Sequence, residues 1–216
     1  MSTLKVNTIQ DTATNNAMTI SGGVVTFPNK PSGTGASLEL IASNTTGGSG
    51  ATLEFDLSTD TKYFSQKLIV WGVYRTDGSD GDLYGSVRND ADNSYIGSGY
   101  YTSVVGYHSQ GSSGRTNSNA GDWNATYFRI GGYNIGDSAD HEDNVWEFDF
   151  YNSIGTTKRM SYIGRRVGHS SDATLAVETF GGRLLHTAQI DRFKLENGSG
   201  ATTGYAGYQL YGLLKA

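Results

Sequence analysis

The chain has 216 residues, a formal net charge of −5, 30 glycines, 14 tyrosines and no cysteine. A negative balance argues against a nucleic-acid partner, since phosphate binding needs clustered Lys and Arg, and the lack of cysteine excludes disulfides, thiol catalysis and zinc–thiolate sites. No apolar run approaches the roughly 20 residues of a membrane span, so we expect no membrane insertion.

The first 36 residues alternate short β-branched runs with Asn, Thr, Ser and Gly. This pattern predicts short strands at 4–9, 17–20 and 23–27. Lone strands leave backbone donors, acceptors and edges uncovered, and identical copies in a symmetric assembly would cover them. We therefore predict that residues 1–36 form an extended β attachment and oligomerisation segment, with a disordered leader as the alternative. The apolar attachment residues would be Leu4, Val6, Ile9, Met18, Ile20, Val24, Val25 and Phe27.

Residues 37–216 read as a series of strands separated by Gly, Asp, Asn and Ser clusters. Apolar residues alternate with polar ones at 53–57, 127–130 and 145–151, which is the period of a half-buried strand. The nearly apolar run 67–74 reads as a strand covered on both sides. Further strands are expected at 159–166, 190–195 and 208–214. The predicted core consists of Leu53, Phe55, Trp71, Phe128, Trp146, Phe148 and Phe150.

Such short, turn-punctuated strands predict an all-β fold in which residues 37–216 form a jelly-roll-like antiparallel β-sandwich. The polar segment 108–122 is expected to overhang the sheet as a surface loop. Residues 175–190 are the one place for a short helix, which Gly181 and Gly182 would break. The basic pairs Lys158–Arg159 and Arg165–Arg166 are expected on solvated strand faces.

We expect no catalytic site, no metal and no cofactor. The four histidines are scattered, and His141 lacks the second ligand of a zincin motif. Glu147 and Asp149 share a strand face, as any half-exposed strand allows, so they are weak evidence for glycoside hydrolysis. Two acidic loops lack the spacing of a calcium loop and are expected to be solvated turns. They contain Asp77, Asp80, Asp82, Asp137, Asp140, Glu142 and Asp143.

Tyrosines and one tryptophan stand beside glycines and small polar residues between positions 95 and 123. Aromatic faces in such surroundings can stack on sugar rings while polar groups hold the hydroxyls. The alternative is that these rings pack against neighbouring strands or between subunits. The candidate glycan-contact residues are Tyr95, Tyr100, Tyr101, Tyr107 and Trp123.

The two ends of the chain carry a resemblance. "STLKVNTIQDTATNNAMTISGGVVTFPNKP" followed by "LELIAS", and the closing "IDRFKLENGSGATTGYAGYQLYGLLKA", resemble virion structural proteins of tailed bacteriophages, especially marine and cyanobacterial ones. The N-terminal part is similar to the attachment segments of tail-fibre proteins. This resemblance implies a trimeric appendage of the virion. The chain is shorter than long fibres with a shaft, which leaves a short fibre, a head fibre and a capsid decoration protein open.

The expected function is therefore that of a short tail-fibre-like appendage. It would dock through residues 1–36 onto other virion proteins of the tail, the portal region or the capsid. The sandwich would face outward, where it could recognise a host surface polysaccharide. The protein would be assembled in the host cytoplasm and reside in the virion. The other hypotheses are a freestanding carbohydrate-binding module and, against the lack of β-helical repeats, a polysaccharide depolymerase.

Overall fold

The computed structural model describes residues 8–10, 16–21, 24–26, 38–75, 83–110, 114–130, 144–169, 175–197 and 202–215. The chain divides into two compact units, residues 1–37 together with 216, and residues 38–215. All regular structure in the described residues is β-strand, and they contain no helix that could cross a membrane.

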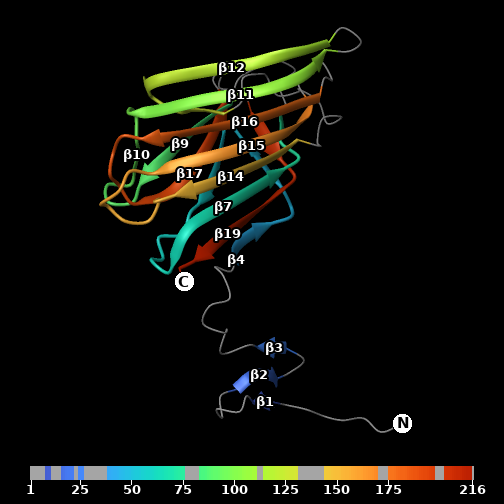
Figure 1. Cartoon of the computed structure of the whole chain (residues 1–216), viewed down its shortest axis with the longest axis vertical. Coiled ribbons are helices and arrows are strands. Elements are labelled where there is room, and N and C mark those ends of the chain that lie inside the picture. The colour runs from blue at the N-terminus through green and yellow to red at the C-terminus, as the bar shows by residue number, and fades with distance from the viewer. Residues whose placement is uncertain are drawn as a thin grey trace. The chain divides into compact units, whose positions relative to one another are not determined.

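The N-terminal unit contains a three-stranded antiparallel sheet of β1 (Thr8–Gln10), β2 (Asn16–Ser21) and β3 (Val24–Thr26), in that order (Figure 1). These strands pair with one another, so they are not the lone strands assumed in the prediction from the sequence. β1 and β3 form the edges of the sheet. Five of the predicted attachment residues lie on these strands: Ile9, Met18, Ile20, Val24 and Val25. Leu4, Val6 and Phe27 lie outside the described residues.

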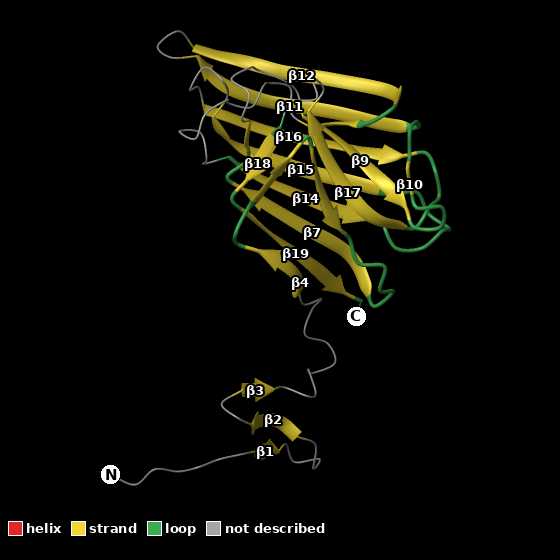
Figure 2. Ribbon diagram, turned by 180° about the vertical axis from the view of Figure 1, so that it is seen from behind, coloured by secondary structure: helices red, strands yellow, loops and turns green. Residues whose placement is uncertain are grey.

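The second unit is an antiparallel β-sandwich, as the sequence predicts (Figures 1 and 2). Its larger sheet has the strand order β12 (Gly114–Ala125), β11 (Tyr100–Gln110), β16 (Leu175–Leu184), β15 (Ser161–His169), β14 (Val145–Tyr151), β7 (Tyr63–Trp71), β19 (Gly207–Leu214), β4 (Leu38–Asn44). The smaller sheet has the order β10 (Ser94–Tyr95), β9 (Leu83–Asn89), β17 (Ile190–Asn197), β6 (Thr52–Asp56), with β13 (Phe128–Ile130) also paired to β9. A third sheet joins β5 (Gly48–Gly50), β18 (Thr203–Tyr205) and β8 (Tyr74–Arg75).

The core lies between the two main sheets and is rich in aromatic rings. Trp146, Phe148 and Phe150 of β14 are fully buried, because alternate residues of a strand point to the same face. Across the interior, the Phe148 ring lies 4.9 Å from the ring of Phe193 on β17. Leu53, Phe55 and Phe128 are also buried. The predicted core is therefore confirmed at six of its seven positions.

Trp71 is the exception. It is only half-buried, and so is Ile69, whereas Leu68 and Val70 are fully buried. The strand therefore alternates, and the prediction that it is covered on both sides is wrong. On the outer face Trp71 stands opposite Gly207 of β19, where a side chain would overlap the indole. The missing side chain at Gly207 gives the Trp71 ring room to pack against its neighbour strand.

One local prediction is wrong, and the one place left open for a short helix is a strand, for a shared reason. Residues 108–110 and 114–122 are not an overhanging loop, because they belong to the antiparallel strands β11 and β12, which pair with each other. Residues 175–184 form β16 rather than a helix, and Gly181 and Gly182 remain in the strand. β12 is an edge strand with one neighbour, so it needs no apolar pattern of its own. Pairing between strands overrides local preference at both places.

The basic pair Arg165–Arg166 is divided between the two faces of β15. Arg165 is exposed, but Arg166 is fully buried, which corrects the expectation of a solvated pair. The Arg166 guanidinium lies 3.4 Å from the carboxylate of buried Glu178 and 5.1 Å from the centre of the Trp146 ring. Burial lowers the pKa of Arg166, and the charge of Glu178 opposes that shift.

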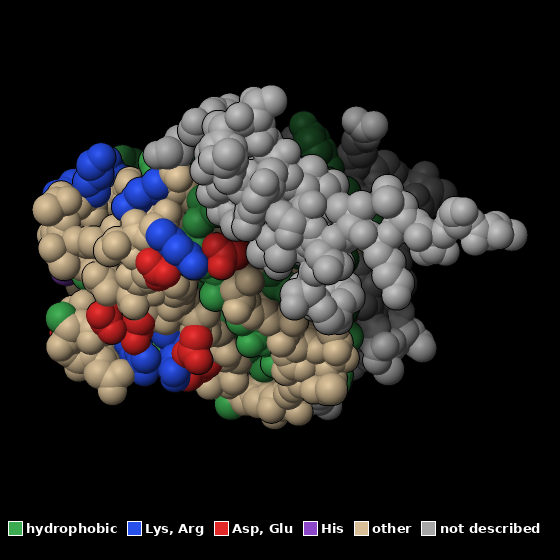
Figure 3. All heavy atoms as spheres, turned by 90° about the horizontal axis from the view of Figure 1, so that it is seen from below, with side chains coloured by type: hydrophobic (Ala, Val, Ile, Leu, Met, Phe, Trp, Pro, Cys, Tyr) green, Lys and Arg blue, Asp and Glu red, His purple; other side chains and the backbone are tan. Residues whose placement is uncertain are grey.

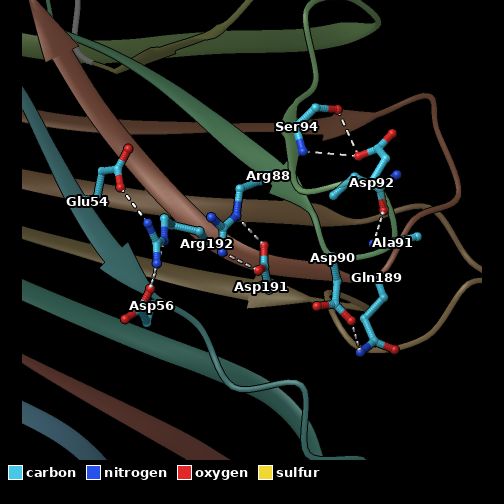
Figure 4. A network of polar contacts seen from close by, with 11 residues as sticks. Glu54, Asp56, Arg88, Asp90, Ala91, Asp92, Ser94, Gln189, Asp191 and Arg192 are labelled. Atoms are coloured by element: carbon cyan, nitrogen blue, oxygen red, sulfur yellow. Dashed lines mark hydrogen bonds and ion pairs between the residues drawn. The ribbon is translucent and has the colours of Figure 1, made fainter.

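The outer face of the smaller sheet is covered by ion pairs. Figure 4 shows Arg192 of β17 between Glu54 and Asp56 of β6, with both carboxylates at 2.6 Å, and Arg88 of β9 paired with Asp191. Basic and acidic side chains also lie next to one another on the surface seen in Figure 3. Such interspersed charges are typical of a solvated face. The outer face of the larger sheet also carries ion pairs, but many of its exposed side chains are apolar.

Candidate functional site

The outer face of the larger sheet is hollowed where β12, β11, β16 and β15 lie side by side. The hollow has a volume of about 580 Å³ and opens to solvent. A second hollow of about 370 Å³ adjoins it and shares Ser103 and Gly181 with it. We call the first hollow the aromatic groove, which is lined by Tyr101, Thr102, Ser103, Gly121, Asp122, Trp123, Ser161, Gly181, Gly182 and Arg183.

The register of the strands explains the shape of the aromatic groove. Arg183 lies directly opposite Tyr101 on one side and Ser161 on the other, so these side chains share the outer face and form one wall with Trp123. The next row across the same strands is Gly121, Ser103 and Gly181. This row has no large side chain, so it forms a low floor beside the aromatic wall. Ile163, opposite Gly181, begins the other wall.

A β-bulge orients Trp123. Tyr100 pairs with Ala125 and Thr102 with Asp122, so β12 has one residue more than β11 at this point. Asn124 takes up the extra length with a φ of 56°, a left-handed conformation that Asn tolerates better than most residues. Bulges bend a strand and re-aim its side chains. Trp123 stands nearly perpendicular to the Tyr101 ring, and 83% of its surface is exposed.

The groove carries one uncompensated charge among the described residues. Its charged lining residues are Asp122 and Arg183. Asp122 lies 3.9 Å from the guanidinium of Arg129, which neutralises it. The Arg183 guanidinium lies over the Tyr101 ring, 5.5 Å from the ring centre, and pairs with no carboxylate of the described residues. The groove therefore combines exposed aromatic surface, serine hydroxyls and a free cation.

The structure brings two of the five candidate glycan-contact residues together, Tyr101 and Trp123. Tyr100 is fully buried; its hydroxyl donates to the carbonyl of Ile96 at 2.8 Å, and burial raises its pKa. The prediction for Tyr100 is therefore wrong, because adjacent strand residues point to opposite faces. Tyr95 lies on the smaller sheet under Lys194. Tyr107 is exposed on β11, six residues and about 20 Å along the strand from Tyr101.

Sequence reasoning missed the other members of the groove. Arg183, Ser161 and Gly181 come from β15 and β16, far along the chain from the tyrosine-rich segment. Only the strand register places them beside Tyr101. The sequence holds one signal for Arg183, which is the alternation along β16. Val177, Thr179 and Gly181 alternate with buried residues, and continuing this alternation places Arg183 on the same outer face.

A row of apolar side chains crosses the same face of the sheet. Each member lies directly opposite the next one on the neighbouring strand, and together they span five strands. Tyr107, for example, is 53% exposed, and the three valines are exposed as well. Exposed apolar side chains next to one another are typical of surfaces that contact other molecules. This apolar row consists of Tyr107, Val177, Val167, Val145 and Trp71.

The paired carboxylates of β14 are engaged by cations. The Lys67 ammonium lies 3.4 Å from Glu147 and 3.1 Å from Asp149, and Arg165 lies 3.0 Å from Glu147. These ion pairs engage both of the carboxylates that a glycosidase would direct at its substrate. Among the described residues, no group of acidic or histidine side chains could hold a metal ion. Both acidic loops singled out in the sequence, and His141, lie outside that part of the chain.

Comparisons with protein-family models, with curated proteins and with solved structures found no match for this chain.

Proposed function

We propose that this protein is a structural component of a bacteriophage virion, a short tail-fibre-like appendage. It attaches through its N-terminal unit and displays the β-sandwich, whose aromatic groove contacts a saccharide of the host surface. It acts by binding and carries out no catalysis. The attachment role rests on the resemblance of both chain ends, and the recognition role rests on the groove.

The observation that carries the proposal is the exposure of Trp123. Nine aromatic side chains of the described sandwich are buried in its core, where they contribute to stability, and the other exposed rings, such as Phe64 at 55%, are much less exposed than Trp123 at 83%. Trp123 instead stands in solvent on the wall of a hollow, held there by a bulge. An aromatic face beside hydroxyls and a charged group is a combination that binds a ligand with both apolar and polar surfaces. A sugar ring has both.

Two further observations support the attachment role. The N-terminal residues form a compact unit of their own, and its small sheet has two edge strands, β1 and β3, which could add strands from a partner. The apolar row supports assembly of several copies, because contiguous exposed apolar side chains often mark contacts with other proteins. We include a homotrimer in the proposal, as the resemblance implies.

Deletion of residues 1–36 tests the attachment role. The shortened chain should give the far-ultraviolet spectrum of a folded β protein and keep its saccharide binding. It should not be incorporated into particles in a host in which the full-length chain is incorporated. Incorporation of the shortened chain at the level of the full-length chain would show that the N-terminal unit is not the attachment segment.

A freestanding carbohydrate-binding module is the second candidate, because all described residues of the groove belong to the sandwich unit. Light scattering separates the two proposals. An appendage of the proposed kind should have three times the chain mass of 23.1 kDa, whereas a freestanding module should have the mass of one chain.

A further inference from the structure

We infer that the aromatic groove takes an acidic saccharide and that Arg183 binds the carboxylate of one of its sugars. This inference rests on the proposed saccharide-binding function and adds the chemical class of the ligand. It follows from the charge of the groove, from the surroundings of the Arg183 guanidinium and from the shape of the floor.

The charge of the groove selects an anion. Arg129 neutralises Asp122, so the Arg183 guanidinium is the net charge of the described lining residues. Other arginines on the main sheets do have carboxylate partners: Arg165 pairs with Glu147, Arg166 with Glu178, and Arg88 and Arg192 with acidic residues of the smaller sheet. Arg183 alone of this set has only an aromatic partner. A carboxylate supplied by a ligand would complete the same pattern.

The surroundings of Arg183 suit a planar anion beside a sugar ring. Its guanidinium carbon lies 5.5 Å from the centre of the Tyr101 ring, within the range of a cation–π contact, and such a contact uses the face of the guanidinium rather than its N–H donors. A guanidinium edge binds a carboxylate with two parallel hydrogen bonds. Trp123 contacts the same Tyr101 ring with a centroid distance of 5.1 Å. A sugar stacked on the exposed indole would therefore lie near the Arg183 edge.

The floor of the groove leaves space for the rest of the saccharide. Gly121, Ser103 and Gly181 lie on three neighbouring strands, which are spaced about 4.8 Å apart. The groove therefore runs across the strands, and Ser103 and Ser161 place hydroxyls along it. Because the whole chain has a net charge of −5, a densely charged polyanion would be repelled. A mostly neutral saccharide with an isolated acidic sugar fits best.

The test uses an array of bacterial surface oligosaccharides and sialosides in which each carboxylated glycan is printed beside its carboxyl-reduced, neutral counterpart. The full-length protein should bind one or more carboxylated glycans and bind the reduced counterpart about tenfold more weakly, the loss expected for one charge-assisted hydrogen-bonded contact. The Arg183→Ala variant should bind the carboxylated glycan about tenfold more weakly. It should no longer distinguish the two forms, because the two changes remove the same interaction.

Arg165→Ala is the matched control, since Arg165 is an exposed arginine on the same sheet face but outside the aromatic groove. It should bind as the unmodified protein does. Thermal unfolding of both variants reports whether either substitution disturbs the fold. The inference is overturned if the unmodified protein binds reduced glycans as well as carboxylated ones, and the proposed function then still stands. Binding to no glycan of either form overturns the recognition role itself.

Discussion

The indole of Trp123 stands at 79° to the ring of Tyr101, with 5.1 Å between their centres, at the exposed edge of the larger sheet. This edge-to-face contact is one of the two preferred geometries of aromatic pairs. It depends on a bulge that gives β12 one residue more than its neighbour. The recognition surface that we propose thus depends on an irregularity in the pairing of β11 with β12.

Substitution of Asn124 tests the role of the bulge. Asn124 has a φ of 56°, which a β-branched residue adopts with strain. Asn124→Val should lower the free energy of unfolding by about 1–2 kcal/mol and weaken saccharide binding, because Trp123 loses its orientation. Asn124→Gly, which adopts this conformation freely, should leave stability within about 0.5 kcal/mol of the original. Chemical denaturation and glycan binding measure both effects, and equal behaviour of the two variants would contradict the bulge mechanism.

The buried ion pair gives a prediction about stability. Glu178→Gln removes the carboxylate that opposes the buried guanidinium of Arg166, and it should lower the free energy of unfolding by about 3 kcal/mol. Glu147→Gln is the matched control, since Glu147 is a partly exposed member of an ion pair with Arg165 on the same sheet. Its cost should be below about 1 kcal/mol. Equal costs in urea denaturation would show that burial does not set the strength of the pair.

Glu54 should make stability depend on pH. Burial raises its pKa, but the Tyr95 hydroxyl and the Arg192 guanidinium beside it together outweigh burial, so the pKa lies below its ordinary value of 4.5. A carboxyl whose pKa is lower in the folded state stabilises the protein above its ordinary pKa and loses that contribution as the pH falls through the folded value. Glu54→Gln should therefore be less stable than the original chain at pH 7. The difference should shrink in acid, and a difference that grows below pH 4 would contradict this mechanism.

Much of the fold could be predicted from the sequence, because the alternation of apolar and polar residues within a single strand determines which side chains face the core. In β14, Trp146, Phe148 and Phe150 alternate with acidic residues, and this period alone places three rings in the core. The turn residues between such runs indicate antiparallel strands. β12 escaped prediction because an edge strand pairs through its backbone and needs no apolar pattern. Trp71 was misplaced because its packing depends on Gly207, a residue of a strand far along the chain.

The candidate site could be predicted only in part. Aromatic residues beside glycines pointed to Tyr101 and Trp123, but the same argument included Tyr100, which the alternation of strand faces should have excluded. Arg183 and Gly181 could not be found in this way. They reach the groove through the pairing of β11 with β16, and register depends on contacts across the whole sheet.

The most direct test of the account is the effect of Trp123→Ala on saccharide binding. Because Trp123 is largely exposed, its loss should change the free energy of unfolding by less than about 0.5 kcal/mol. Isothermal titration with a saccharide bound by the original chain should show binding weakened about 5- to 100-fold, since stacking of a nucleic-acid base on one aromatic ring contributes on the order of 1–3 kcal/mol and a sugar ring buries a similar face. Phe64→Ala, which removes an exposed aromatic residue outside both the groove and the apolar row, should bind normally. Unchanged binding by Trp123→Ala would contradict the claim that the aromatic groove is the recognition site.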